Sequence, residues 1–147
     1  MKSQTTDIVF WQEWPFWLAL SLGPLCWLLM FQLGVPLRDG PAPWGTLLWV
    51  VLLYPVVEEY VFRGVLQPAL LTKLFLKRSI AGLSIANVLT SILFAATHLI
   101  NQPPLMAALV FFPSLVFGWM RDRYANIHAS IVLHMAYNAG FVWLYSG

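Results

Sequence analysis

The sequence predicts an all-α membrane protein, a polytopic bundle of about five transmembrane helices, and three observations predict it. Of the 147 residues, 60% are hydrophobic and only 10% are charged, and the chain carries 8 Trp and 10 Phe. A water-soluble domain of this length needs more polar surface. The hydrophobic residues gather in stretches of about 20 residues, the length that crosses a bilayer as a helix. Turns rich in Pro and Gly, such as "PLRDGPAP" and "NQPP", separate these stretches.

Five stretches are candidate transmembrane helices. The first begins beside Trp11, Trp14 and Trp17, where tryptophan anchors a helix at the membrane interface. The second is apolar apart from three charged residues, and the fourth, at about 17 residues, is short and could be only partly embedded. No repeat or long linker divides the stretches, so we expect a single domain over residues 1–147. The expected spans are residues 15–35, 44–66, 79–100, 104–120 and 125–145.

The basic residues are distributed unevenly between the two sides of these spans. With the N-terminus inside, six of them lie on the inner side and only Arg38 lies outside. The positive-inside rule therefore predicts a cytoplasmic N-terminus and an external C-terminus, and we expect the bacterial inner membrane as the location. A formal net charge of +2, with no basic cluster among aromatics, argues against nucleic-acid binding. The inner basic residues are Lys2, Lys73, Lys77, Arg78, Arg121 and Arg123.

The second span contains three ionisable residues, Glu58, Glu59 and Arg63, in "YPVVEEYVFRG". Each ionised residue near a helix centre costs about 2.5–3.5 kcal/mol on insertion scales. Glu59 and Arg63 are separated by one helical turn, with Glu on the N-terminal side, the favourable order for an ion pair. Glu58 lies about 100° further round the helix and has no obvious partner there. We therefore expect Glu59 and Arg63 to neutralise each other and Glu58 to have a different task.

Two other spans carry polar residues that could meet Glu58. His98 ends "FAATH" near the end of the third span, and "HMAYN" places His134 and Asn138 on one face of the fifth. Such residues usually face a bundle interior or a wet cavity. Taken singly, Asn138 could join two helices by a hydrogen bond, and His98 could be a satisfied buried histidine. Together, the four residues predict a shared polar pocket.

These residue types suit hydrolysis by an activated water. A carboxylate removed from water holds a proton more tightly, which makes it a better general base near neutral pH. Glu58 with a histidine could hold and deprotonate a water, while a second histidine and an asparagine donate hydrogen bonds to the oxyanion that forms. No Ser or Cys nucleophile is needed. One carboxylate and two histidines could also bind zinc, but the helical HExxH pattern is absent.

Three motifs occur in order along the chain: "EEYVFR" fits EExxxR, "FAATH" fits FxxxH and "HMAYN" fits HxxxN. In these motifs the sequence resembles the CAAX-protease and bacteriocin-processing (CPBP, or Abi) family of intramembrane proteases, which includes the Ras-converting CAAX endoprotease. The similarity covers about residues 50–143, the expected protease core. Each motif is weak alone, but three in order, each in an apolar helix, are specific.

The resemblance implies a role for each motif residue. Glu58, the first Glu of EExxxR, would be the catalytic base, and His98 would help to position the water. His134 and Asn138 would form the oxyanion site, and the Glu–Arg pair of the second span would brace the pocket. The family was long labelled as metalloproteases, but its members look like glutamate-dependent hydrolases, so the resemblance implies no cofactor, with zinc as the alternative.

The expected function is therefore that of a glutamic-type intramembrane endopeptidase. It would hydrolyse a peptide bond near the C-terminal, membrane-associated tail of a protein or peptide substrate anchored in the lipid bilayer. Family members commonly have about eight spans, so this chain resembles a compact core, as in the small subgroup that processes JDVT-CTERM sorting signals. A homo-oligomer or a partner helix could complete the substrate groove. The alternative function is a proton-coupled small transporter or channel component that uses Glu58 and the histidines as a relay.

Overall fold

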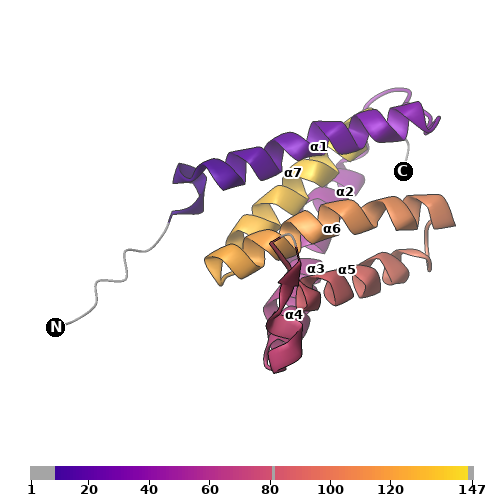
Figure 1. The fold of residues 1–147 in the computed structure, drawn as a ribbon. Helices are drawn as coiled ribbons and strands as arrows, with labels where there is room; N and C mark the ends of the chain where they lie inside the picture. Colours follow the sequence, from indigo (N-terminus) through magenta and orange to yellow (C-terminus); the bar gives the residue numbers. More distant parts are fainter. Residues whose placement is uncertain (1–8, 81, 146–147) are drawn as a thin grey trace.

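The computed structural model, which describes residues 9–80 and 82–145, is a bundle of helices with one short hairpin in the described part of the chain (Figure 1). The prediction of an all-α fold is confirmed. The long helices are α1 (Trp14–Gln32), α5 (Ile85–His98), α6 (Pro104–Tyr124), α7 (His128–Leu144) and a continuous helix from Trp44 to Leu71. This last helix comprises α2 (Trp44–Thr46), η2 (Leu47–Leu53), α3 (Tyr54–Glu59), η3 (Tyr60–Leu66) and α4 (Gln67–Leu71). Short 3₁₀ turns lie at η1 (Phe10–Gln12) and η4 (Leu74–Lys77).

The helix from Trp44 to Leu71 alternates between α and π geometry. In the π segments η2 and η3 the backbone bonds reach back five residues, and the N–H of Tyr54 closes η2 on the carbonyl of Trp49. A proline follows each π segment, Pro55 after η2 and Pro68 after η3. A proline has no N–H and its ring clashes with the carbonyl four residues back. A wider turn before the proline relieves that clash, so the helix continues past residue 66, where the sequence prediction ended it.

The third expected span is only partly helical. Strands β1 (Ser79–Ile80) and β2 (Leu83–Ser84) form a small antiparallel hairpin where the prediction had helix. The following helix α5 has 14 residues. It begins after Ser84 because the hydroxyl of this residue accepts a hydrogen bond from the Asn87 N–H at 3.0 Å, which caps the helix.

The fourth and fifth spans also differ from their predicted bounds. Helix α6 has 21 residues and continues to Tyr124, so the prediction of a short fourth span is wrong. Ala125, with a left-handed φ of 54°, ends it. Helix α7 begins at His128 instead of near residue 125.

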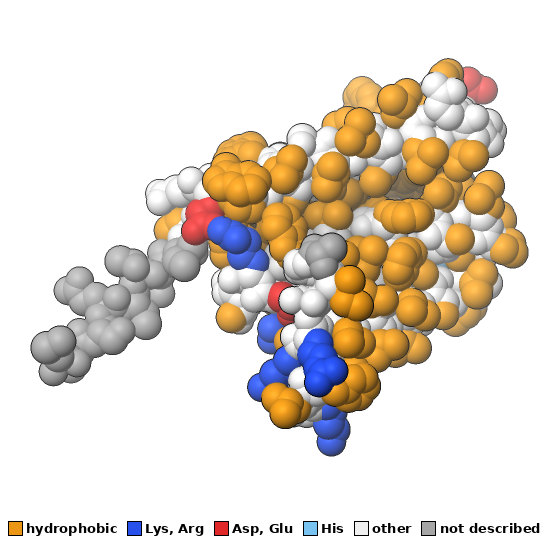
Figure 2. Space-filling model, viewed as in Figure 1, with side chains coloured by type: hydrophobic (Ala, Val, Ile, Leu, Met, Phe, Trp, Pro, Cys, Tyr) orange, Lys and Arg blue, Asp and Glu red, His pale blue; other side chains and the backbone are white. Residues whose placement is uncertain are grey.

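Three helices of the described chain are long and apolar enough to cross a membrane: α1, the helix from Trp44 to Leu71, and α6. Helices α5 and α7 are shorter, at 14 and 17 residues. Hydrophobic side chains cover most of the surface in Figure 2, as expected for a protein that faces lipid. Lys73, Lys77 and Arg78 are exposed in the connection between α4 and β1. Blue Lys and Arg side chains gather at the lower end of Figure 2, near the place of α4 in Figure 1. Lys2, which the orientation prediction also used, lies outside the described residues.

Helices α1, α6 and α7 share the hydrophobic core. Its buried residues are Phe10, Phe16, Ala19, Phe117, Met120, Ala129, Leu133 and Tyr137. The hydroxyl of Tyr137 donates to the carbonyl of Ala19 at 2.5 Å, which joins α7 to α1. The long helix packs against α7 through η2 and α3, and against α5 through η3 and α4 (Figure 1). Its middle therefore lies between α5 and α7, which positions the two adjacent glutamates.

Candidate active site

Glu58 and Glu59 are neighbours at the end of α3 but have different surroundings. The side chain of Glu59 is fully buried, whereas that of Glu58 is 31% exposed and lines a cavity. Because successive residues on a helix point about 100° apart, the two carboxylates face different neighbours. One glutamate is therefore held inside the bundle, and the other is accessible to a ligand.

The predicted pair of Glu59 and Arg63 is present and forms part of a larger buried network. Arg63 Nη1 donates to Glu59 Oε1 at 3.2 Å, and both side chains are fully buried. Arg63 Nη2 donates to Ser114 of α6 twice, to the backbone carbonyl at 2.9 Å and to the hydroxyl at 2.5 Å. The guanidinium carbon also lies 4.6 Å from the ring centroid of Phe94. Arg63 is therefore fixed by the long helix, α5 and α6 together.

His134 of α7 lies between the two glutamates. Its Nδ1 atom is 2.9 Å from Glu59 Oε1, and its Nε2 atom is 3.6 Å from Glu58 Oε2. The ring stacks on Phe117, with centroids 4.8 Å apart and planes at 21°. Because Glu59 is an ion-paired carboxylate, it can only accept a hydrogen bond, so Nδ1 of His134 carries hydrogen and Nε2 faces Glu58.

His98 and Asn138 are each anchored to a backbone carbonyl. His98 Nδ1 lies 2.9 Å from the carbonyl oxygen of Phe94, one turn earlier on α5. Since a carbonyl only accepts, Nδ1 is the donor, and Nε2 of the neutral ring is left as an acceptor. Asn138 Nδ2 donates to the carbonyl oxygen of Val50 at 2.8 Å, and this bond uses one of its two N–H groups. Val50 belongs to the π segment η2, so the wide turn receives a bond from α7.

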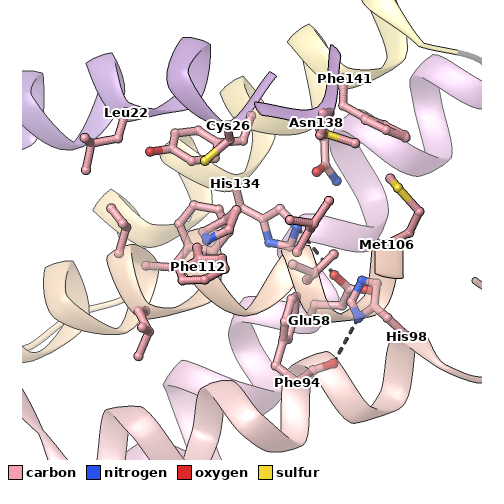
Figure 3. Close-up of a pocket in the computed structure, with 18 of the residues that line it drawn as sticks. Leu22, Cys26, Glu58, Phe94, His98, Met106, Phe112, His134, Asn138 and Phe141 are labelled. Atoms are coloured by element: carbon pink, nitrogen blue, oxygen red, sulfur yellow. Dashed lines mark hydrogen bonds and ion pairs between the residues drawn. The ribbon is translucent and has the colours of Figure 1, made fainter. Parts of the chain in front are cut away.

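One cavity of about 1010 Å³ brings the four predicted site residues together. Figure 3 shows the side chains of Glu58, His98 and His134 pointing toward one another, with Asn138 further along α7. All four residues line the wall of this cavity. The cavity has α1 on one side and α6 on the other (Figures 1 and 3).

Sequence reasoning missed several residues that stabilise the site through buried hydrogen bonds. Ser114 lies in an apolar helix, and no spacing pattern links it to Arg63. Gln67, one turn after Arg63, is fully buried and donates to Asp122 at 2.8 Å. Asp122 also accepts from the hydroxyl of Ser84 at 2.6 Å. The turn spacing of 59, 63 and 67 was a usable signal, since it places three polar residues on one face of the helix.

Metal ligation was an open alternative from the sequence. Within residues 9–80 and 82–145, no group of three or more His, Cys, Asp or Glu side chains is arranged to hold a metal ion. The imidazole Nδ1 atoms of both histidines are already directed at oxygen acceptors. Their free positions are the two Nε2 atoms, which are suited to a water or a substrate carbonyl.

Comparison with known proteins identifies the family. No curated protein and no solved structure matches the chain significantly. A family model described as type II CAAX prenyl endopeptidase Rce1-like matches residues 40–140. These residues include all three motifs and the four predicted site residues of the cavity, and the match confirms the resemblance to CAAX proteases. The chain therefore belongs to the Rce1-like family of type II CAAX prenyl endopeptidases, a family of membrane proteases.

Proposed function

We propose that the chain is a glutamic-type intramembrane endopeptidase in which Glu58 activates a water for attack on a peptide bond. The observation that carries the proposal is the arrangement at the cavity wall. The partly exposed carboxylate of Glu58 lies 3.6 Å from the Nε2 atom of His134, while Nδ1 of the same ring contacts a second, buried carboxylate at 2.9 Å. Membership of a family of membrane endopeptidases supports the same reaction class.

The first step orients the water. Glu58 accepts one of its two hydrogens, and Nε2 of neutral His98 accepts the other, because Nδ1 of His98 already donates to the Phe94 carbonyl. With both hydrogens engaged, a lone pair on the water oxygen is free to attack. Glu58 then takes a proton as the oxygen adds to the carbonyl carbon.

The second step stabilises the oxyanion. Asn138 has one amide N–H available, because Val50 accepts the other. Nε2 of His134 can donate only when the ring is an imidazolium, since Nδ1–H is committed to Glu59. The proposed oxyanion site therefore combines one neutral amide donor with one charged imidazolium donor.

The third step breaks the peptide bond. As the tetrahedral intermediate collapses, its carbon–nitrogen bond breaks, and the proton held by Glu58 passes to the leaving amine. The products are a new carboxyl end and a new amino end, and Glu58 returns to its carboxylate form. No covalent intermediate and no cofactor enters this sequence, which separates it from a zinc mechanism.

The proposed substrate is a membrane-anchored protein or peptide cut near its C-terminal tail. The distribution of basic residues supports a cytoplasmic N-terminus under the positive-inside rule, and we propose that the protein lies in the bacterial inner membrane with its C-terminus external. A second copy of the chain is the proposed means of completing a substrate groove.

The test is cleavage of a co-expressed, tagged membrane-tail substrate by wild type and Glu58→Gln. General-base catalysis contributes about 10²–10⁴-fold, so the variant should lose nearly all activity. Wild-type cleavage should persist with a strong chelator, and loss under chelation would establish the zinc alternative. Cleavage that survives Glu58→Gln would overturn the proposed mechanism. Proton flux that depends on Glu58, without any cleavage, would favour the transporter alternative.

A further inference from the structure

The connection between α4 and α5 exposes cationic and apolar side chains together. Residues 73–80, which we call the basic loop, include three exposed cations and three exposed large hydrophobic residues. Figure 2 shows Lys and Arg side chains beside hydrophobic ones at its lower end, near the place of α4 in Figure 1. The cations are Lys73, Lys77 and Arg78, and the hydrophobic residues are Leu74, Phe75 and Ile80.

The three cations of the basic loop have no anionic partner among the described residues. None of the ion pairs between described residues involves them. The sequence has no Asp or Glu between Glu59 and Asp122. The carboxylate of Asp122 is already engaged, since it accepts from Gln67 at 2.8 Å and from Ser84 at 2.6 Å. The three positive charges are therefore available to an external anion.

Packing and backbone hydrogen bonds hold the basic loop in place. Leu76 of η4 is buried, and η4 packs against both α4 and α5. Strands β1 and β2 pair Ser79 with Ser84, and the N–H of Ile85 donates to the carbonyl of Arg78 at 2.9 Å. The loop therefore presents its cations from an ordered backbone, which lowers the entropic cost of binding a ligand.

The 3₁₀ turn places an apolar side chain beside each of two cations. In a 3₁₀ helix, residues three apart lie on the same side of the axis. Leu74, which is 83% exposed, therefore lies one turn before Lys77. Phe75 lies one turn before Arg78, whose N–H donates to the Phe75 carbonyl at 3.3 Å. Two cation–apolar pairs thus lie next to each other, a pattern that suits an amphiphile with an anionic head and an apolar tail.

The position of the basic loop favours a lipid over a soluble anion. The loop follows the helix from Trp44 to Leu71, which is apolar and long enough to cross a membrane. A loop directly after a spanning helix lies at the level of the lipid headgroups. A soluble phosphate would pair with the cations but leave Leu74 and Phe75 in water, whereas an acyl chain covers these apolar side chains.

We infer that the basic loop binds an anionic phospholipid of the leaflet that it faces. The headgroup phosphate pairs with Lys73, Lys77 and Arg78, and the acyl chains contact Leu74 and Phe75. The described residues of this loop do not line the catalytic cavity. The lipid site is therefore separate from the active site, and its test does not depend on the proposed reaction.

The test measures the Kd of the first bound lipid by native mass spectrometry of the full-length protein in detergent. The protein is titrated with phosphatidylglycerol and with zwitterionic phosphatidylcholine of the same acyl chains. Phosphatidylglycerol should bind about tenfold more tightly, and a triple variant with Gln at residues 73, 77 and 78 should lose this preference. Equal Kd values for the two lipids, or a preference that the triple variant retains, would overturn the inference.

A pair of single arginine variants separates a local site from an effect of net charge. Arg78→Gln should raise the Kd for phosphatidylglycerol a few-fold. Arg123→Gln is the matched control and should leave it unchanged, because Arg123 already pairs with Glu13 at 3.0 Å. The same increase in both variants would mean that only net charge matters and would contradict a site in the basic loop.

The apolar half of the site distinguishes a lipid from a soluble anion. Leu74→Ser combined with Phe75→Ser should raise the Kd for phosphatidylglycerol about tenfold. Inorganic phosphate should not displace the lipid. An unchanged Kd in this double variant, or displacement by inorganic phosphate, would show a simple anion site and refute the inference. Displacement by a soluble acidic peptide would also refute it, because the partner would then be a protein.

Discussion

Nδ1 of His134 lies 2.9 Å from Oε1 of Glu59, closer than its Nε2 lies to Glu58 at 3.6 Å. The same Oε1 atom accepts from Arg63 at 3.2 Å. The buried glutamate therefore orients the histidine and fixes which ring nitrogen carries hydrogen. Under the proposed mechanism, Glu58 remains free to act on a water, and the two adjacent glutamates have separate functions, one in positioning and one in catalysis.

Replacing Glu59 by Gln should lower kcat by about 10²-fold or more, because the amide no longer fixes the tautomer and orientation of the His134 ring through its Nδ1 atom. KM should change little, since Glu59 does not line the cavity. Glu59→Asp keeps the charge and should recover part of the activity. The measurement is kcat and KM in the tail assay, with Asp39→Asn in an exposed loop as the control.

Glu59→Gln also leaves Arg63 without its charged partner inside the bundle. Breaking a buried ion pair lowers the free energy of unfolding by about 3–5 kcal/mol. The thermal unfolding midpoint of each variant must therefore be measured in detergent, and kcat compared only for folded protein. Full activity of folded Glu59→Gln would show that the contact with His134 has no catalytic role.

Ser114→Ala should be milder, because Arg63 Nη2 keeps its bond to the backbone carbonyl of residue 114 and loses only the hydroxyl. We expect a loss of about 1 kcal/mol in the free energy of unfolding, together with a few-fold lower kcat as Arg63 and Glu59 become less well fixed. Ser21→Ala on the exposed face of α1 is the control. An unchanged unfolding midpoint for Ser114→Ala would mean that its hydroxyl does not hold Arg63.

Sequence patterns predicted the ion pair of Glu59 and Arg63, because helical spacing alone brings these side chains together. They also predicted that Glu58, His98, His134 and Asn138 share a pocket, since polar residues in a membrane bundle avoid lipid. These four lie on three different helices, so only their residue types carried that prediction. Their catalytic roles remain predictions.

Other features depend on relations that no local pattern encodes. Hydropathy does not distinguish α from π geometry, so the bonds that reach back five residues in η2 and η3 were not foreseen. Which glutamate lies closer to His134 depends on the rotation of α7 against the long helix. The hairpin at residues 79–84 interrupts a stretch that is apolar enough to be read as helix.

Asn138→Ala should lower kcat by about 10²–10³-fold, the effect of removing one oxyanion donor. The variant also loses the bond to the Val50 carbonyl, a single neutral hydrogen bond between α7 and η2, which otherwise remain packed together. Asn101→Ala is the matched control, because Asn101 is exposed and lines the same cavity. It should retain kcat within a few-fold. A similar decrease for both variants would point to a general change of the cavity and not to a specific donor.

Gly118 of α6 allows α5 to approach closely, and adding a methyl group there should destabilise the bundle. A Cβ at this position would lie 1.9 Å from Asn87 Oδ1 and 2.5 Å from its Cγ, so the Asn87 side chain would have to move. Asn87 Nδ2 donates to the carbonyl of Leu115 at 2.9 Å, and its Oδ1 accepts from Ser91 at 3.2 Å. Gly118→Ala should therefore lower the free energy of unfolding by about 1–3 kcal/mol, as overpacking of a core does.

Gly45→Ala is the control, since nothing lies within 4 Å of its added Cβ and alanine favours a helix. Thermal unfolding in detergent should show a lower midpoint for Gly118→Ala only, and equal midpoints would contradict the close packing of α5 on α6.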